Sequence, residues 1–244
     1  MNLVQVGIGA VAVTVAGVFV ALQHRAGSAL GESPARRARI AALSAVAAAA
    51  WLGLWFAIAS TGVLKQLDAR PPPFLFVFAA TFAMAAFLGL SGIGRRLSAG
   101  LPLATLIAVH GFRVPLEWVM HQAYERKIMP VQMSWSGWNF DVVTGLLALV
   151  VAALAAQGKA PRWLLVAWTG LSFVTLFVVA GIAAASTPLI HAFGTSPERL
   201  NTWIADPPYV WLPTVMVAFA LAGQLMVVRK LLASRAPALS PVPG

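Results

Sequence analysis

Long apolar runs separated by short polar breaks dominate this sequence. Seven of these runs approach the roughly 20 residues that a helix needs to cross a bilayer. They cover about residues 3–22, 40–61, 74–94, 101–122, 140–157, 163–186 and 208–228. Proline, glycine and charged residues gather in the breaks, as is typical of loops between membrane helices. We therefore predict an all-α fold, an integral membrane bundle of seven transmembrane helices.

Composition supports the membrane class. Hydrophobic residues make up 60% of the 244 residues, charged residues make up 10%, and the mean hydropathy is +0.83. A soluble domain is nearer to roughly half apolar and a quarter charged. The chain has no cysteine, which excludes a disulfide framework and thiolate chemistry. We treat residues 1–235 as one transmembrane domain and the proline-rich residues 236–244 as a flexible cytoplasmic tail.

The basic residues predict an orientation, because cytoplasmic loops of membrane proteins carry an excess of lysine and arginine. One set of alternate loops contains Arg25, Arg36, Arg37, Arg39, Arg95, Arg96, Lys159, Arg162, Arg229, Lys230 and Arg235. The other set contains only Lys65, Arg70, Arg126, Lys127 and Arg199. The bias predicts an N-terminus outside and a cytoplasmic C-terminus. The net charge of +10 is then a topology signal, with anionic lipid headgroups rather than nucleic acid as its partner.

Four ionisable residues mark the predicted fourth helix. His110, Arg113, Glu117 and His121 are spaced so that a regular helix places them within about 80° of one face. Ionisable side chains inside a membrane are costly and usually mark a functional site. In the predicted orientation His110 lies near the middle of the membrane and the other three lie further out. Asn139 and Asp141, which open the next helix from the same side, complete the candidate site.

Several functions remain open for these residues. Arg113 can pair with Glu117 or Asp141 in a purely structural ion network, as expected of a scaffold protein. Alternatively, they form an outward-facing pocket in which Arg113 binds a small anion and Glu117 or His121 handles a proton. A third hypothesis is an enzyme acting on a lipid or other amphiphile at the outer leaflet, with Glu117 and His121 as acid and base. We favour small-ligand binding or carriage.

Metal binding has weaker support. Glu117 and His121 have a spacing of four residues that suits two ligands of one ion, and Asp141 or His191 could add a third. No HExxH or repeated ligand motif accompanies them. We therefore predict no metal site and keep Glu117, His121 and His191 as weak candidates. The sequence leaves any cofactor unknown, and no GxSxG motif of a serine hydrolase is present.

One segment carries a family resemblance. Residues 130–141 read PVQMSWSGWNFD. This resembles the P-x-x-M-[ST]-[FW]-x-G-x-N-F-D segment of an uncharacterised family of bacterial polytopic membrane proteins with about seven helices. Residues 208–213, PYVWLP, resemble the start of the last helix in that family. The resemblance implies a bacterial cytoplasmic (inner) membrane location, brings no mechanism, and adds weight to Asn139 and Asp141 as site residues.

Overall fold

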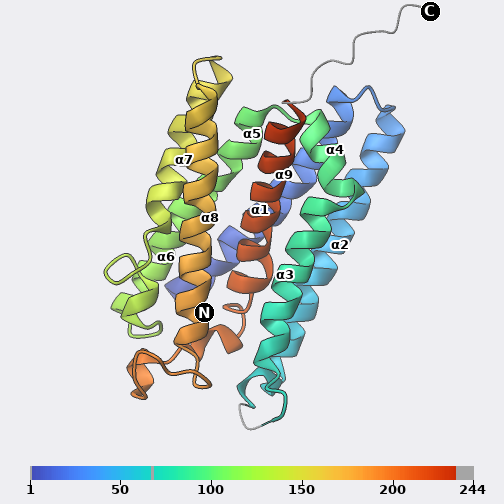
Figure 1. Cartoon of the computed structure of the whole chain (residues 1–244). Coiled ribbons are helices and arrows are strands. Elements are labelled where there is room, and N and C mark those ends of the chain that lie inside the picture. The colour runs from blue at the N-terminus through green and yellow to red at the C-terminus, as the bar shows by residue number, and fades with distance from the viewer. Residues whose placement is uncertain (1, 67–68, 235–244) are drawn as a thin grey trace, which may run out of the picture.

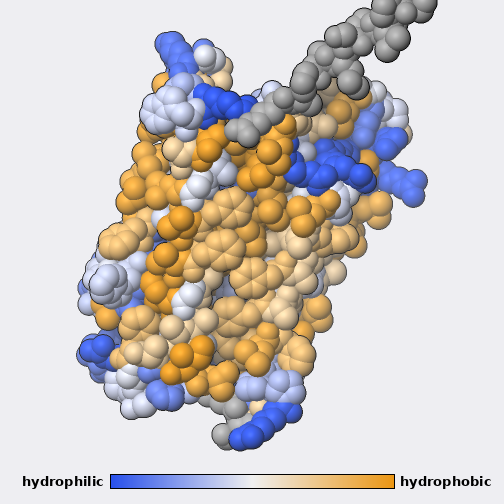
Figure 2. Space-filling model, viewed as in Figure 1, coloured by the Kyte–Doolittle hydropathy of each residue, from blue (hydrophilic) through white to orange (hydrophobic). Residues whose placement is uncertain are grey.

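The computed structural model describes residues 2–66 and 69–234, and every regular element among them is a helix. Figure 1 shows long helices that run side by side between the two ends of one bundle. The surface seen in Figure 2 is apolar between these ends and carries hydrophilic residues at both of them. The predicted tail at 236–244 lies outside the described residues.

The α-helices are α1 (Leu3–Ala29), α2 (Pro34–Ser60), α3 (Phe74–Leu90), α4 (Gly92–Gly100), α5 (Leu103–Ala108), α6 (Arg113–Glu125), α7 (Asp141–Ala156), α8 (Arg162–Ala185) and α9 (Ala218–Ala233). Short 3-10 turns are η1 (Val63–Lys65), η2 (Val109–Phe112), η3 (Val131–Met133), η4 (Pro197–Arg199) and η5 (Trp203–Ala205). A π-helical turn, η6 (Leu212–Val217), leads into α9. The segments α5, η2 and α6 follow one another directly as one span.

Five helical segments in the described part of the chain are long and apolar enough to cross a membrane. They are Leu3–Ala29, Pro34–Ser60, Leu103–Glu125, Arg162–Ala185 and Leu212–Ala233. The pair α3 and α4, bent by 52°, makes a sixth if it is counted as one span. Helix α7 is apolar but has only 16 residues. The prediction of an all-helical fold is therefore confirmed for the described residues, with five or six candidate membrane spans where seven were predicted.

The second helix begins earlier than its apolar run because local capping decides where it starts. The hydroxyl of Ser33 accepts a hydrogen bond from the Arg36 amide at 3.3 Å, and Pro34 occupies the first helical turn. Helix α1 likewise continues to Ala29, beyond its predicted end at residue 22. The arginines that we assigned to a loop therefore lie on the helices themselves.

The bend between α3 and α4 lies at Ser91 and brings α4 back over the bundle. Ser91 ends α3, and its hydroxyl caps α4 by accepting from the Ile93 amide at 3.2 Å. Gly94 packs so closely on α3 that an added Cβ would lie 2.6 Å from the carbonyl carbon of Gly89. Helix α4 also packs against α1 and α9. The basic residues of α4 are thus brought close to the connection between α1 and α2.

Candidate functional site

The predicted fourth helix is interrupted at the site by the 3-10 turn η2, which contains His110 and Gly111. Pro115 has no amide hydrogen, so the carbonyl of Gly111 loses its normal helical partner. A 3-10 turn also advances by about 120° per residue instead of 100°. The prediction that the four residues share one helical face is therefore corrected, because His110 lies in the 3-10 turn and the other three residues lie in α6.

Arg113 lies at the start of α6 and is 1% exposed. Its Nη1 donates a hydrogen bond to Oδ1 of Asp141, the first residue of α7. Oγ1 of Thr175, on α8, donates to the same carboxylate oxygen at 2.7 Å. Thr144 Oγ1 lies 2.9 Å from Thr175 Oγ1 and donates to it, because the single hydroxyl hydrogen of Thr175 points to Asp141. This ion pair therefore connects three helices.

Glu117 lies one turn further along α6 and is 2% exposed. Asn139 Nδ2 donates to Glu117 Oε2 at 2.8 Å and to the carbonyl of Met133 at 3.0 Å. Asn139 Oδ1 accepts from the Asp141 amide at 3.0 Å. One buried asparagine thus links the Glu117 carboxylate to the start of α7. Its amide group can have only one orientation here, because Nδ2 faces two acceptors and Oδ1 faces a donor.

The segment 130–141 forms a compact turn over the end of α6, and this turn is what carries Asn139 to Glu117. Gly137 approaches η3 so closely that an added Cβ would lie 2.7 Å from the Cα of Gln132. The side chain of Gln132 donates to Ser186 Oγ at 3.0 Å and to the Arg199 carbonyl at 2.8 Å. These contacts fix the turn to the connection that follows α8.

His110 is 1% exposed and faces α8 and α9 rather than Asp141. Its ring lies edge-on to Trp168, with 5.2 Å between ring centroids. A Cβ on Gly223 of α9 would lie 2.9 Å from His110 Nε2, so the glycine makes room for the ring. Neither ring nitrogen has a hydrogen-bond partner among the described residues.

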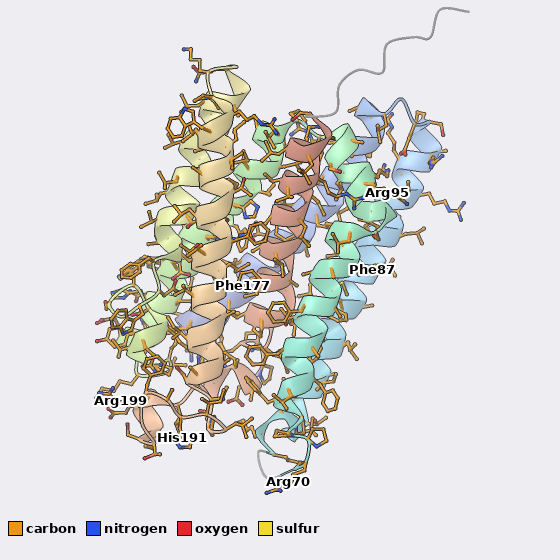
Figure 3. All side chains as sticks on the ribbon, viewed as in Figure 1. Arg70, Phe87, Arg95, Phe177, His191 and Arg199 are labelled. Carbon is orange, nitrogen blue, oxygen red and sulfur yellow. The ribbon has the colours of Figure 1, made fainter. Side chains whose placement is uncertain are left out.

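The remaining histidines of the prediction lie apart from this cluster. His121 stacks on Trp135 with 4.5 Å between ring centroids, and its Nε2 lies 3.8 Å from Glu125 Oε1. His191 is exposed on the connection between α8 and η6 (Figure 3). Within residues 2–66 and 69–234, no three His, Asp or Glu side chains are grouped closely enough to hold a metal ion. The weak metal candidates Glu117, His121 and His191 are therefore not brought together.

The structure encloses the part of the site that we expected to be open. His110, Arg113, Glu117, Asn139 and Asp141 are each at most 5% exposed. The guanidinium of Arg113 is only partly satisfied, because Nε and Nη2 are buried without a partner in the described part of the chain. Arg113 therefore uses Nη1 in its ion pair with Asp141, while the donors Nε and Nη2 make no hydrogen bond to the described residues.

Sequence reasoning missed the hydroxyl groups and the glycines around these charges. Thr144 and Thr175 extend the hydrogen bonds of Asp141, and Gly145 of α7 allows a close approach to Arg113, whose Cβ lies 3.0 Å from the position of an added Cβ. The spacing of Asp141 and Thr144, three residues apart on one helix, was the available signal. Thr175 follows Ser172 at the same spacing on α8, but no acidic or basic residue in this apolar run indicates that it reaches Asp141.

Comparison with protein families, with curated proteins and with solved structures finds no match to this chain. Its function is therefore inferred from its side chains.

Proposed function

We propose that this chain is a seven-span protein of the bacterial inner membrane that binds a small anion at Arg113. The N-terminus lies outside and the C-terminus lies in the cytoplasm, as the basic residues predict. Helix α7 is the seventh span in this proposal. Its 16 residues are about 24 Å long, so it is shorter than the hydrocarbon core of about 30 Å and requires local thinning of the bilayer.

The sidedness of the connections supports this orientation. The α1–α2, α4–α5 and α7–α8 connections lie at the same end of the bundle as the end of α9 (Figure 1). The connections from α2 to α3, from α6 to α7 and from α8 to η6 lie at the other end. The first end, with its adjoining helix turns, carries Arg25, Arg36, Arg37, Arg39, Arg95, Arg96, Lys159, Arg162, Arg229 and Lys230. The second carries Lys65, Arg70, Arg126, Lys127 and Arg199.

The single observation that supports anion binding is the unused edge of the Arg113 guanidinium. Nη1 of Arg113 donates to Asp141, whereas Nε and Nη2 are buried without a partner among the described residues. The N–H groups of Nε and Nη2 point in parallel, which matches the two oxygens of a carboxylate or phosphate. A buried donor without a partner costs free energy, and an anion on this edge removes that cost. We infer that the ligand is a small carboxylate or an anion of similar size.

We propose that Glu117 couples anion binding to the uptake of a proton. An anion that enters this cluster adds one negative charge beside the carboxylates of Asp141 and Glu117. If Glu117 takes up one proton at the same time, the total charge of the buried cluster stays unchanged. Asn139 keeps Glu117 in place through the 2.8 Å hydrogen bond. We therefore expect the affinity for the anion to rise as the pH falls.

Entry of the ligand requires a movement, because the cluster is enclosed. The turn at residues 130–141 covers it at the end that we place outside, and η2 with Pro115 provides a break in the helix beneath it. Breaks of this kind are tolerated in membrane helices where they line an internal site. We propose that the ligand enters from the outer side when the 130–141 turn moves away from α6.

Thermal unfolding of the purified protein in detergent tests this function. The probes are formate, acetate, succinate and inorganic phosphate, with chloride as the reference salt at equal ionic strength. An anion at 100 times its Kd stabilises the protein by about 2.7 kcal/mol, which corresponds to roughly 5–10 °C in Tm. We expect such a shift for at least one probe, a larger shift at pH 6 than at pH 8, and loss of the shift in Arg113→Lys.

Arg126→Lys serves as the control, because Arg126 lies exposed at the end of the same helix. This variant should keep the anion-dependent shift. If no anion changes the Tm of the native protein and Arg113→Lys only lowers it, the cluster is a structural ion network and anion binding is wrong. The alternative of an outer-leaflet enzyme has less support, since it needs Glu117 and His121 at one substrate, and these side chains have different partners.

A further inference from the structure

A long apolar groove lies between α2 and α3, with α1 and α9 as its floor. Its volume is about 550 Å³, within the range of ligand pockets in proteins. Phe19 of α1, Ala48 of α2, Phe87 of α3 and Phe219 of α9 are among the side chains that line it. The polar groups in its wall include Gln23 and Arg96, which are close to the basic end of the bundle. Figure 3 shows Phe87 on the α3 side of this region.

The groove exists because α2 presents small side chains to α3. Ser44, Ala47 and Ala48 line the middle of its wall, on the same face as Ile40 and Trp51. From Ile40 to Trp51 the helix rises by about 17 Å. Trp51 closes the far end, where its Nε1 donates to the carbonyl of Thr214 in the π-helical turn at 2.9 Å. The groove is therefore a slot that starts at the basic end of the bundle and is closed at Trp51.

An ion pair fixes the basic end of the slot. Arg96 donates to both carboxylate oxygens of Glu32, at 3.0 and 2.7 Å, and to Gln23 Oε1 at 2.6 Å. Gly27 leaves the space for this arrangement, because an added Cβ would lie 2.5 Å from Glu32 Oε2. The neighbouring Arg95 is exposed, and its Nη2 lies 3.9 Å from the position of a Cβ on Gly92, which lines the slot.

Positive charge is in excess around this end. Arg36, Arg37 and Arg39 lie on the first turns of α2. Arg37 packs beside Arg96 of α4, since a Cβ added to Gly27 would lie 2.9 Å from Arg37 Cγ and also close to Arg96 Nη2. Glu32 is the acidic side chain that pairs with them, and it already contacts Arg96 and Arg36. Arg37 Nε is buried without a partner in the described part of the chain. An apolar slot of this shape with cationic donors at its entrance matches an acyl chain joined to an anionic headgroup.

We propose that this slot holds one acyl chain of an anionic phospholipid, whose phosphate lies between Arg37 and Arg95. The lipid belongs to the cytoplasmic leaflet if the orientation proposed above is correct, and this assignment rests on that orientation. The slot itself is separate from the anion site at Arg113, because none of its lining residues belongs to that cluster.

Native mass spectrometry of the full chain in detergent tests the proposal. Phosphatidylglycerol and phosphatidylcholine with identical acyl chains are added separately. We expect one tightly bound phosphatidylglycerol, at least fivefold more occupied than phosphatidylcholine at equal concentration. Ala48→Phe, which fills the slot, should lower the occupancy of both lipids at least fivefold. Ala49→Phe is the matched control, since Ala49 is exposed and does not line the slot.

The preference for an anionic headgroup is tested by the double variant Arg37→Gln, Arg95→Gln, which should lower phosphatidylglycerol binding to the level of phosphatidylcholine. Equal lowering by Ala48→Phe and Ala49→Phe, or no lowering by Ala48→Phe, overturns the proposal. A dimer that Ala48→Phe dissociates also overturns it, because a second copy then occupies the slot. If Ala48→Phe is not monodisperse, Ser44→Leu replaces it. Arg113→Lys should leave lipid binding unchanged, so that failure of anion binding is distinguishable from failure of this site.

Discussion

At Asp141 the surroundings of one carboxylate determine whether a buried charge is tolerated. Its Oδ1 accepts from Arg113 Nη1 and from Thr175 Oγ1, and its amide donates to Asn139. Removing a hydrogen bond to a charged group costs more than removing one between neutral groups. The hydroxyl of Thr175 is therefore expected to matter more than its small size suggests.

Thr175→Val should lower the free energy of unfolding by about 1.5–3 kcal/mol, because it leaves a buried carboxylate with one fewer donor. Thr169→Val on the same helix is the matched control, since Thr169 Oγ1 donates only to the Leu165 carbonyl of its own helix. We expect the control to change stability by less than about 1 kcal/mol. Denaturant titration in mixed micelles measures both, and equal losses would contradict the role of Thr175.

The sequence identified the charges of this site better than their partners. Arg113, Glu117, Asn139 and Asp141 are conspicuous because each is polar within or beside an apolar run. Their pairing is set by the turn at residues 130–141, whose path depends on close backbone contacts at Gly137. Periodicity along a helix carries no information about such a turn. For the same reason the unused edge of Arg113 is visible only in three dimensions.

At the scale of elements, capping residues and helix breaks decide more than hydropathy does. The start of α2 is fixed by Ser33 and Pro34, six residues before the predicted edge at residue 40. Hydropathy alone shows neither the 3-10 turn at His110 nor the π-helical turn before α9, although Pro115 and Pro213 mark these places in the sequence. The connection between α1 and α2 is held in place by Glu32, whose carboxylate accepts two hydrogen bonds from Arg96 on α4.

The Glu32–Arg96 pair makes stability depend on pH. Its hydrogen bonds with Arg96 lower the pKa of Glu32 below its usual value of 4.5, and the positive charges of Arg96, Arg36 and Arg37 act in the same direction, while partial burial opposes them. A carboxylate with a lowered folded-state pKa stabilises the protein above its unfolded-state pKa. That contribution is lost as the pH falls through the folded-state value.

We expect Glu32→Gln to unfold at a lower temperature than the native protein at pH 7. The difference in Tm should begin to shrink as the pH falls below about 4.5, where the unfolded chain takes up the proton, and it should vanish below the lower folded-state pKa of Glu32. Tm measured between pH 3 and pH 7 tests this expectation. Glu198→Gln, which changes an exposed carboxylate on η4, is the control and should follow the native curve. A difference for Glu32→Gln that stays constant with pH would rule out the proposed linkage.

At the scale of the whole molecule, apolar runs predict the class and the lengths of most helices, because a bilayer imposes both. They do not predict the slot between α2 and α3, since that depends on how far two helices diverge. The number of spans depends on α7, whose ends are Asp141 and Ala156. The segment Leu103–Glu125, which ends in α6, and helix α8 are both long and apolar enough to span, and α6 and α8 pack against α7. Whether α7 crosses the membrane therefore decides between six and seven spans, and this question needs a direct test.

Introduced thiols provide that test, because the natural sequence contains no cysteine. Ser136→Cys, Gln157→Cys and Thr195→Cys each place one thiol at an exposed position, before α7, between α7 and α8, and after α8. In spheroplasts, a membrane-impermeant maleimide should label Ser136→Cys and Thr195→Cys, and it should label Gln157→Cys only after permeabilisation. The cysteine-free protein controls for background. Labelling of Ser136→Cys and Gln157→Cys from the same side would show that α7 does not cross, whereas a reversal of all three would invert the orientation and move the lipid slot to the outer leaflet.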